Sequence, residues 1–184
     1  MARRGAATVN LREIIREIPD FPKPGINFKD ITPILADGQA LRYVIKRMAE
    51  RFREAGVDRV VGVESRGFLF GAPLAYELGC GFALVRKPGK LPCAVERVEY
   101  ALEYGTDALE IHRDAVEPGQ RVLMVDDLLA TGGTIGGAMD LVQRLGGNIV
   151  GAAFVIELTF LGGRARLTER GVSDILTLVT YDAE

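Results

Sequence analysis

VLMVDDLLATGGT, residues Val122 to Thr134, is the stretch that decides the fold. Four apolar residues predict the end of a buried strand, which runs into two aspartates and a turn of small residues. A helix is predicted to follow at 135–145, closed by two glycines. Ligands of a doubly wound sheet bind beyond the carboxyl ends of its strands. The stretch therefore predicts a ligand site at one edge of a parallel sheet.

The rest of the chain alternates between strand and helix patterns, which predicts an α/β fold. Strands are expected at 59–63, 82–86, 121–125, 149–156 and 175–180. Helices are expected at 11–18, 40–55, 68–78, 135–145 and 163–170. Because the strands are apolar along their whole length, we expect a doubly wound, mostly parallel sheet with helices on both faces.

Two segments do not fit this alternation and are predicted to be additions at one end of the sheet. Pro19, Pro22, Pro24 and Pro33 are expected to block regular structure across 19–33. Residues 96–104 and 108–112 predict a β-hairpin that turns at Gly105.

The turn at Ala130 to Thr134 predicts a phosphate site. The backbone N–H groups of Thr131, Gly132, Gly133 and Thr134 can converge on one anion at a helix N-terminus, and both threonines add hydroxyl donors. Asp126 and Asp127 would repel a phosphate, but carboxylates accept hydrogen bonds from a sugar diol and stabilise positive charge on a sugar ring. A ribose 5-phosphate site is predicted; the alternative is a solvated helix cap.

Composition excludes several classes of protein. The 184 residues are 48% hydrophobic and 26% charged with a net charge of −2, which gives no overall basic field for nucleic acid or membrane, although a local basic patch stays open. Cys80, Cys93 and the single His112 offer no disulfide framework, metal-ligand cluster or Ser-His-Asp triad. No secretory signal or membrane-spanning run is recognised, so a cytoplasmic protein is expected.

Further motifs support a family resemblance. IPDFPKPG (18–25), INFKDITPIL (26–35), VESRGFLFG (63–71), VRKPGKLP (85–92) and LEYG (102–105) occur in order with the 122–134 motif. From about Pro19 to Thr159 the chain resembles the adenine-specific members of the type I phosphoribosyltransferase family. The resemblance implies one domain over 1–184: a hood over the base (1–35), a core (36–160) with a flexible loop at 87–109, and a closing helix and strand (161–184).

The resemblance also implies the reaction. Adenine and 5-phosphoribosyl 1-pyrophosphate would give AMP and pyrophosphate by inverting, oxocarbenium-like displacement at the ribose anomeric carbon. Mg²⁺ would be held mainly by the pyrophosphate and ribose hydroxyls, with no dedicated protein metal site. A homodimer is implied, with no nucleic-acid or membrane partner.

The family's sugar-phosphate contacts are transferred residue by residue. The residues that would bind phosphoribosyl pyrophosphate or AMP are Ser65, Arg66, Arg86, Lys87, Lys90, Asp126, Asp127, Ala130, Thr131, Gly132, Gly133 and Thr134. The peptide bond before Ser65 is often cis in this family, and the loop cations reach pyrophosphate partly across the dimer interface. The alternative for Arg86, Lys87 and Lys90 is a solvated basic loop, and the alternative for Arg66 is an exposed surface arginine.

The base contacts would come from the hood, the acid motif and the hairpin. Phe28 and Leu128 would cover the two faces of adenine, and the backbones of Asn27 and Lys29 would read its amino edge. Glu103, beside Tyr104, would handle a proton on the imidazole side and would have a raised pKa. Glu103, Arg66 and Asp127 are the predicted catalytic residues. Core packing for Phe28 and an exposed hairpin position for Glu103 are the alternatives.

Three other functions are compatible with the motifs. A related enzyme could use guanine or xanthine, and INFKD is the stretch that would discriminate between bases. A regulator of transcription could bind phosphoribosyl pyrophosphate, but the proline-rich segment and negative net charge disfavour DNA binding. A non-catalytic relative is disfavoured by Glu103, Arg66 and the aspartate pair.

Overall fold

The computed structural model describes residues 9–102 and 105–183. The chain divides into two compact units, with the boundary between Val44 and Ile45. The organisation predicted from the family resemblance, one domain with a hood at 1–35, stays a prediction.

The first unit contains a short antiparallel ribbon. α1 (Leu11–Ile14) leads into β1 (Arg16–Ile18), which pairs with β2 (Phe28–Asp30) so that Glu17 lies opposite Lys29. The helix predicted over 11–18 is therefore wrong beyond its first turn. Its apolar spacing fits a helical face, but the backbone is extended at Ile15 and the next three residues pair with β2.

The proline-rich segment is also more regular than predicted. After β2 the chain forms α2 (Thr32–Ala36) and then enters α3 (Gly38–Phe52). Pro33 lies in the first turn of α2, where a missing backbone N–H removes no intrahelical hydrogen bond. Pro33 is therefore accommodated as the second residue of a helix, contrary to the prediction that it blocks regular structure.

The second unit is built on a five-stranded parallel sheet in the order β4-β3-β7-β8-β9. After α3 a 3₁₀ turn, η1 (Arg53–Ala55), leads to the first strand, and η2 (Thr159–Leu161) follows β8. The strands and their connecting helices are, in chain order, β3 (Arg59–Val63), α4 (Arg66–Leu78), β4 (Gly81–Val85), β7 (Arg121–Leu129), α5 (Gly133–Arg144), β8 (Asn148–Leu158), α6 (Gly163–Glu169) and β9 (Ile175–Tyr181). The predicted doubly wound parallel sheet is confirmed.

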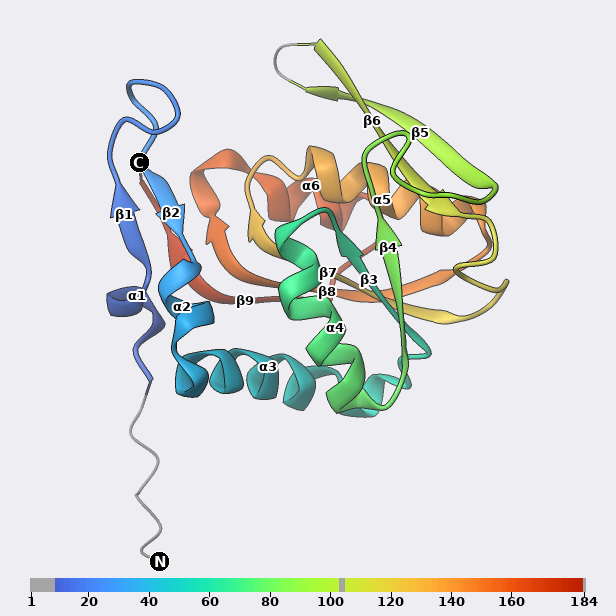
Figure 1. Cartoon of the computed structure of the whole chain (residues 1–184), viewed down its shortest axis with the longest axis horizontal. Helices are drawn as coiled ribbons and strands as arrows, with labels where there is room; N and C mark the ends of the chain where they lie inside the picture. The colour runs from blue at the N-terminus through green and yellow to red at the C-terminus, as the bar shows by residue number, and fades with distance from the viewer. Residues whose placement is uncertain (1–8, 103–104, 184) are drawn as a thin grey trace, which may run out of the picture. The chain divides into compact units, whose positions relative to one another are not determined.

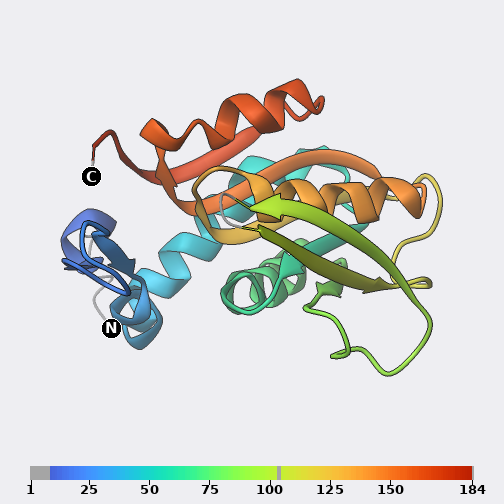
Figure 2. The ribbon, with the colours of Figure 1, turned by 90° about the horizontal axis from the view of Figure 1, so that it is seen from above.

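Helices cover both faces of this sheet. Figures 1 and 2 show α4 on one face, and α5 with a β-hairpin on the other. Residues of α5 and the hairpin share one buried cluster with inward residues of the sheet, including Val61, Met124 and Phe154. On the α4 side, the ring of Phe82 packs so closely against Gly62 and Gly71 that neither position has room for a side chain.

The hairpin is confirmed, but its turn is displaced from the prediction. β5 (Val95–Leu102) pairs with β6 (Gly105–His112) so that Leu102 faces Gly105. Gly105 therefore belongs to β6 and is not the turn residue. Two backbone hydrogen bonds between Arg86 and Glu110 tie β6 to the end of β4. In the described part of the chain, no helix is both long and apolar enough to cross a bilayer.

Candidate functional site

A pocket of about 410 Å³ opens at the carboxyl ends of β3 and β7. From β3 the chain winds through α4 to β4 on one side, and the later strands continue from β7 on the other. The pocket therefore lies at the topological switch point, where doubly wound sheets bind ligands. Its lining residues are Glu64, Ser65, Arg66, Lys87 and the continuous run from Asp126 to Ile135.

The strand that carries the aspartates is longer than predicted. β7 continues through the two aspartates to Leu129, because β8 still pairs with it opposite Phe154 and Glu157. The prediction that the strand ends at Val125 is correct only for the pairing with β3, because the last residue of β7 that pairs with β3 is Val125, opposite Gly62. Asp126 and Asp127 therefore have a strand on one side and the pocket beyond the end of β3 on the other.

The predicted phosphate turn has the required backbone shape. Gly132 has a φ of 79°, in the left-handed region that favours glycine, and α5 begins at the next residue. The N–H groups of Gly133, Thr134 and Ile135 belong to the first turn of α5, which has no earlier carbonyl within the helix to accept them. All of Ala130 to Thr134 line the pocket. The turn therefore presents main-chain donors and a favourable helix field to an anion.

The two aspartates differ in environment. Removal from water, and then repulsion by the neighbouring Asp127 carboxylate, raise the pKa of Asp126 well above the ordinary carboxyl value of 3.8. Asp127 is buried, and its Oδ2 accepts a hydrogen bond of 2.5 Å from Nε of Arg66. Oδ1 of Asp126 accepts from the backbone N–H of Asp127. The pair can thus offer a diol one carboxyl group whose raised pKa favours the protonated form and one carboxylate that is ion-paired with Arg66.

Ser65 and Arg66 reach the pocket from the end of β3. The peptide bond between Glu64 and Ser65 is cis, as the family resemblance implied. Arg66 is the first residue of α4, and its side chain is about half exposed. Gly67 lets α4 approach β7 closely, since a Cβ there would lie 2.8 Å from the carbonyl oxygen of Val125.

The basic loop residues have different surroundings. Of the three predicted cations, Lys87 lines the pocket, whereas Arg86 and Lys90 are not among its described lining residues. The guanidinium of Arg86 binds the Glu64 carboxylate, at 3.2 Å from Nε, and the carbonyl oxygen of Lys90. Burial opposes ionisation of Glu64, but hydrogen bonds from the Lys87 backbone and from Arg86 hold its pKa below the ordinary value. Glu64 therefore anchors this loop, a role that the sequence did not indicate.

Lys87 lies in a network that sequence reasoning missed. Its Nζ is hydrogen-bonded to the carboxylate of Asp107 and lies 3.3 Å from the hydroxyl of Tyr100. Tyr100 and Asp107 are directly opposite each other in the hairpin, so strand pairing places both polar groups on one face. Although burial opposes it, these hydrogen bonds raise the pKa of Lys87 and keep its ammonium charged. The network links a pocket cation to the hairpin.

The predicted base-reading residues in the first unit are packed around Glu17. The Nδ2 of Asn27 and the Nζ of buried Lys29 each lie 2.7 Å from Oε2 of Glu17. Phe28 is half-buried, and its ring meets the ring of Phe21 edge-on at 5.2 Å. Glu17 was not predicted; its position opposite Lys29 follows only from the β1–β2 register.

Leu128, the other predicted base contact, lines the pocket of the second unit. Glu103 and Tyr104 lie outside the described residues.

Comparison with known proteins decides the family. The sequence model of the phosphoribosyl transferase domain matches residues 31–176. The chain belongs to the phosphoribosyl transferase family. It is 60% identical to the adenine phosphoribosyltransferase of Chloroflexus aurantiacus, over 91% of this chain and 96% of that protein. It is 58% identical to the one from Rippkaea orientalis, over 94% of this chain and all of that protein.

Solved structures of phosphoribosyl transferases agree with the fold. The adenine phosphoribosyltransferase of Thermoanaerobacter pseudethanolicus superposes with a TM-score of 0.89 at 56% identity, covering 93% of this chain and 98% of that one. The enzyme from Saccharomyces cerevisiae, complexed with an imino-altritol bisphosphate and adenine, gives 0.84 at 41% identity, covering 91% and 96%. The predicted fold and family are confirmed.

Proposed function

We propose that the protein transfers the phosphoribosyl group of 5-phosphoribosyl 1-pyrophosphate to adenine, forming AMP and pyrophosphate. The observation that carries this proposal is the combination of a glycine-rich turn that opens a helix and an acid pair in one pocket at the switch point. The volume of about 410 Å³ is in the range of small-molecule sites. Adenine is proposed as the base because relatives that match this chain almost end to end are adenine phosphoribosyltransferases.

In this proposal the sugar phosphate is gripped at two points. The turn from Ala130 to Thr134 holds the 5′-phosphate through main-chain N–H groups and threonine hydroxyls. Asp126 and Asp127 hold the ribose diol, because their carboxyl oxygens accept hydrogen bonds from its hydroxyl groups. The nearby carboxylate of Asp127 stabilises positive charge that develops on the ring as the bond to pyrophosphate breaks.

Pyrophosphate is bound by Ser65, Arg66 and Lys87. Arg86 and Lys90 belong to the same segment after β4 as Lys87 and complete this group. Arg66 offers a planar fork of donors that suits phosphate oxygens, and Lys87 supplies a charged ammonium at the pocket wall. Both cations already face a carboxylate, so binding of pyrophosphate exchanges one anionic partner for another. The anomeric carbon inverts because base and pyrophosphate lie on opposite sides of it.

The residues of the pocket fit Mg²⁺ that arrives with the substrate. Carboxylate oxygens of the acid pair are the hard donors that Mg²⁺ prefers. In residues 9–102 and 105–183, no cluster of three or more His, Cys, Asp or Glu side chains forms a metal site. When bound, Mg²⁺ neutralises charge on the departing pyrophosphate.

The base side rests on the family resemblance. Phe28 and Leu128 would cover adenine, with the backbones of Asn27 and Lys29 at its amino edge. Glu103, beside Tyr104, would accept or share the proton that adenine must lose when N9 bonds to the sugar. A carboxamide cannot take that proton, so Glu103→Gln is expected to reduce kcat more than it reduces adenine binding.

We further propose a homodimer located in the cytoplasm. Leu69 and Tyr76 lie two helical turns apart on α4, and their side chains are 45% and 87% exposed. Leu84, on the edge strand β4, is also an exposed large apolar residue. Exposed apolar side chains of this kind mark interaction surfaces. Both cysteines are free thiols, which is usual in a reducing compartment. Sedimentation of wild type against Tyr76→Lys tests the dimer, which is rejected if the wild type sediments as a monomer.

A turnover assay tests the activity itself. Purified protein is incubated with phosphoribosyl pyrophosphate, Mg²⁺ and adenine, guanine, hypoxanthine or xanthine in separate reactions, and nucleotide products are separated by chromatography. AMP from adenine, with far slower conversion of the other bases, is the expected result. Preference for a 6-oxopurine would reassign the base, and absence of every nucleotide would reject the proposed function.

A further inference from the structure

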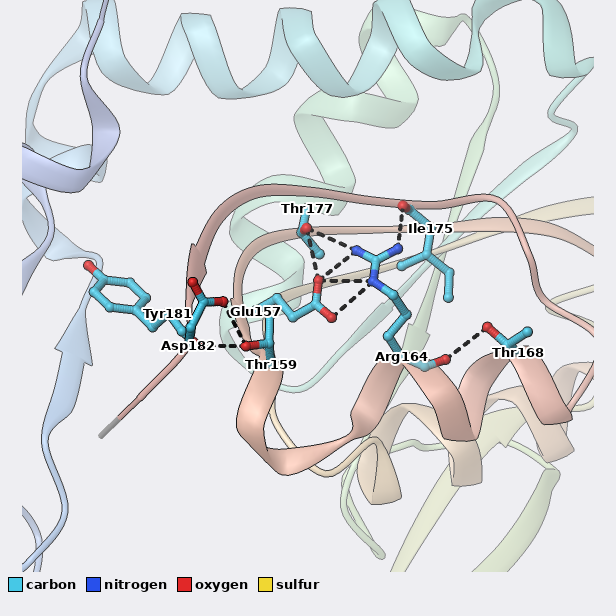
Figure 3. A network of polar contacts seen from close by, with 8 residues as sticks. All are labelled: Glu157, Thr159, Arg164, Thr168, Ile175, Thr177, Tyr181 and Asp182. Carbon is cyan, nitrogen blue, oxygen red and sulfur yellow. Dashed lines mark hydrogen bonds and ion pairs between the residues drawn. The ribbon is translucent and has the colours of Figure 1, made fainter.

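An ion pair between the buried Glu157 and the partly exposed Arg164 lies beside the phosphate turn, and neither residue is among the described residues that line the pocket. Glu157, near the end of β8, is 3% exposed and is opposite Leu129, the last residue of β7. Arg164, the second residue of α6, places its guanidinium on this carboxylate, with Nη2 2.6 Å from Oε2 and Nε 3.0 Å from Oε1. Figure 3 shows the pair and its partners. The carboxylate therefore joins the sheet to the start of α6.

The guanidinium is fixed in more than one direction. Its Nη1 donates to the carbonyl oxygen of Ile175 and its Nη2 to the hydroxyl of Thr177, both on β9. The Thr177 hydroxyl in turn donates to Oε2 of Glu157 at 3.0 Å. Because a planar guanidinium with several satisfied donors has little rotational freedom, Arg164 fixes the first turn of α6 against two strands (Figure 3).

The residue before Arg164, Gly163, packs directly against the phosphate turn. A Cβ at Gly163 would collide with the carbonyl oxygen of Ala130 and would lie 2.9 Å from the Leu129 side chain. A Cβ at Gly132 would lie 3.2 Å from the carbonyl oxygen of Gly163. The backbone of Gly163 thus packs against both Ala130 and Gly132, so any shift of α6 is transmitted to the turn.

We propose that Glu157 and Arg164 are positioning residues for the 5′-phosphate: their pair fixes Gly163, and Gly163 supports the turn at Ala130 to Gly132. The inference rests on the proposed function for the identity of the phosphate. Residues expected to meet pyrophosphate, Ser65, Arg66 and Lys87, come from the ends of β3 and β4. Loss of the pair therefore weakens binding of the sugar's 5′-phosphate while leaving pyrophosphate binding nearly unchanged.

Direct binding measurements separate this role from a general structural one. The dissociation constants of ribose 5-phosphate and of Mg²⁺-pyrophosphate are measured by calorimetry for wild type, Arg164→Lys and Glu157→Gln. Lysine keeps the charge but cannot reach carboxylate, hydroxyl and carbonyl together, and glutamine keeps the shape without the charge. We expect the constant for ribose 5-phosphate to rise about tenfold, since small misplacement of a binding group has large effects, while that for pyrophosphate changes less than about threefold.

A matched control is available in the same unit. Arg51 forms an ion pair of 2.7 Å with Asp174, and neither residue lines the pocket. Arg51→Gln is expected to leave both dissociation constants unchanged. If the variants at 157 and 164 weaken both ligands equally, or weaken neither, the positioning role is overturned.

A milder variant covers the case in which those proteins do not fold. Thr177→Val removes one hydroxyl from the network and keeps the shape of the side chain. We expect about a threefold weaker binding of ribose 5-phosphate, with pyrophosphate unaffected; unchanged affinity rejects the inference. Wild-type protein that binds ribose 5-phosphate but forms no AMP would reject the proposed function alone, because the binding comparison does not require turnover.

Discussion

Nε of Arg66 donates to Oδ2 of Asp127 at 2.5 Å, so a predicted pyrophosphate ligand is the ion-pair partner of a predicted ribose ligand. The relationship holds the two halves of the pocket together before substrate binds. It also makes the two aspartates unequal, because Asp127 faces the guanidinium directly while Asp126 faces mainly its neighbour's charge.

Substitution of each aspartate by asparagine should expose this inequality. Asp127→Asn removes the charge that pairs with Arg66 and stabilises the developing positive sugar, so we expect kcat to fall by about 10²–10³. Asp126→Asn resembles the neutral acid already favoured at that position, so a loss below about tenfold is expected. Steady-state kinetics with saturating adenine measures both; equal losses would contradict the assignment.

The raised pKa of Asp126 predicts that this residue lowers the free energy of unfolding by an amount that depends on pH. A carboxyl with a raised folded-state pKa contributes stability below its unfolded value of 3.8 and loses that contribution as pH rises toward the folded value. Asp126→Asn should therefore be more stable than wild type at neutral pH, and the difference should vanish below about pH 4. Urea unfolding of both proteins over a pH series measures it, and a difference independent of pH would contradict the prediction.

Asp107 should compete with pyrophosphate for Lys87. Asp107→Asn removes the charge that holds the ammonium, so Lys87 becomes available to substrate and its pKa should fall. We expect KM for phosphoribosyl pyrophosphate to decrease severalfold, with little change in KM for adenine. Glu99→Gln, which breaks an exposed pair with Arg97 in the same hairpin, is the control and should have no effect. An unchanged or increased KM in Asp107→Asn would refute competition.

Gly67 should be intolerant of a methyl group. Its Cβ would meet the carbonyl oxygen of Val125 at 2.8 Å and Oδ1 of Asp126 at 3.1 Å, which forces α4 away from the acid pair. Gly67→Ala is expected to lower the free energy of unfolding by roughly 1–3 kcal/mol and to reduce kcat. Gly38→Ala, at a site with no atom within 4 Å, should be neutral or slightly stabilising. Denaturant unfolding and turnover of both variants check the contrast.

Much of the fold follows from local patterns in the sequence. Apolar runs such as Val122–Val125, followed by small turn residues, identify strands and their ligand-binding ends without knowledge of tertiary contacts. The helix predicted at 11–18 failed because its apolar spacing is also compatible with a turn of helix followed by a strand. Only pairing with Phe28–Asp30 distinguishes the two.

The missed site residues share a different cause. Asp107 reaches Lys87 across a hairpin register, and Glu157 reaches Arg164 across a strand-to-helix turn. Neither acid lies in a motif, and both resemble ordinary surface charges when the sequence is considered alone. Their partners are determined by the register and packing of β5–β6, β8 and α6, which no local pattern specifies.

The acid pair, the phosphate turn and Lys87 all lie within Ile45–Ala183, whereas Asn27, Phe28 and Lys29 precede Val44. The predicted sugar-phosphate contacts thus lie in one unit of the chain and three of the predicted base contacts in the other, while Leu128, a further predicted base contact, belongs to the pocket itself.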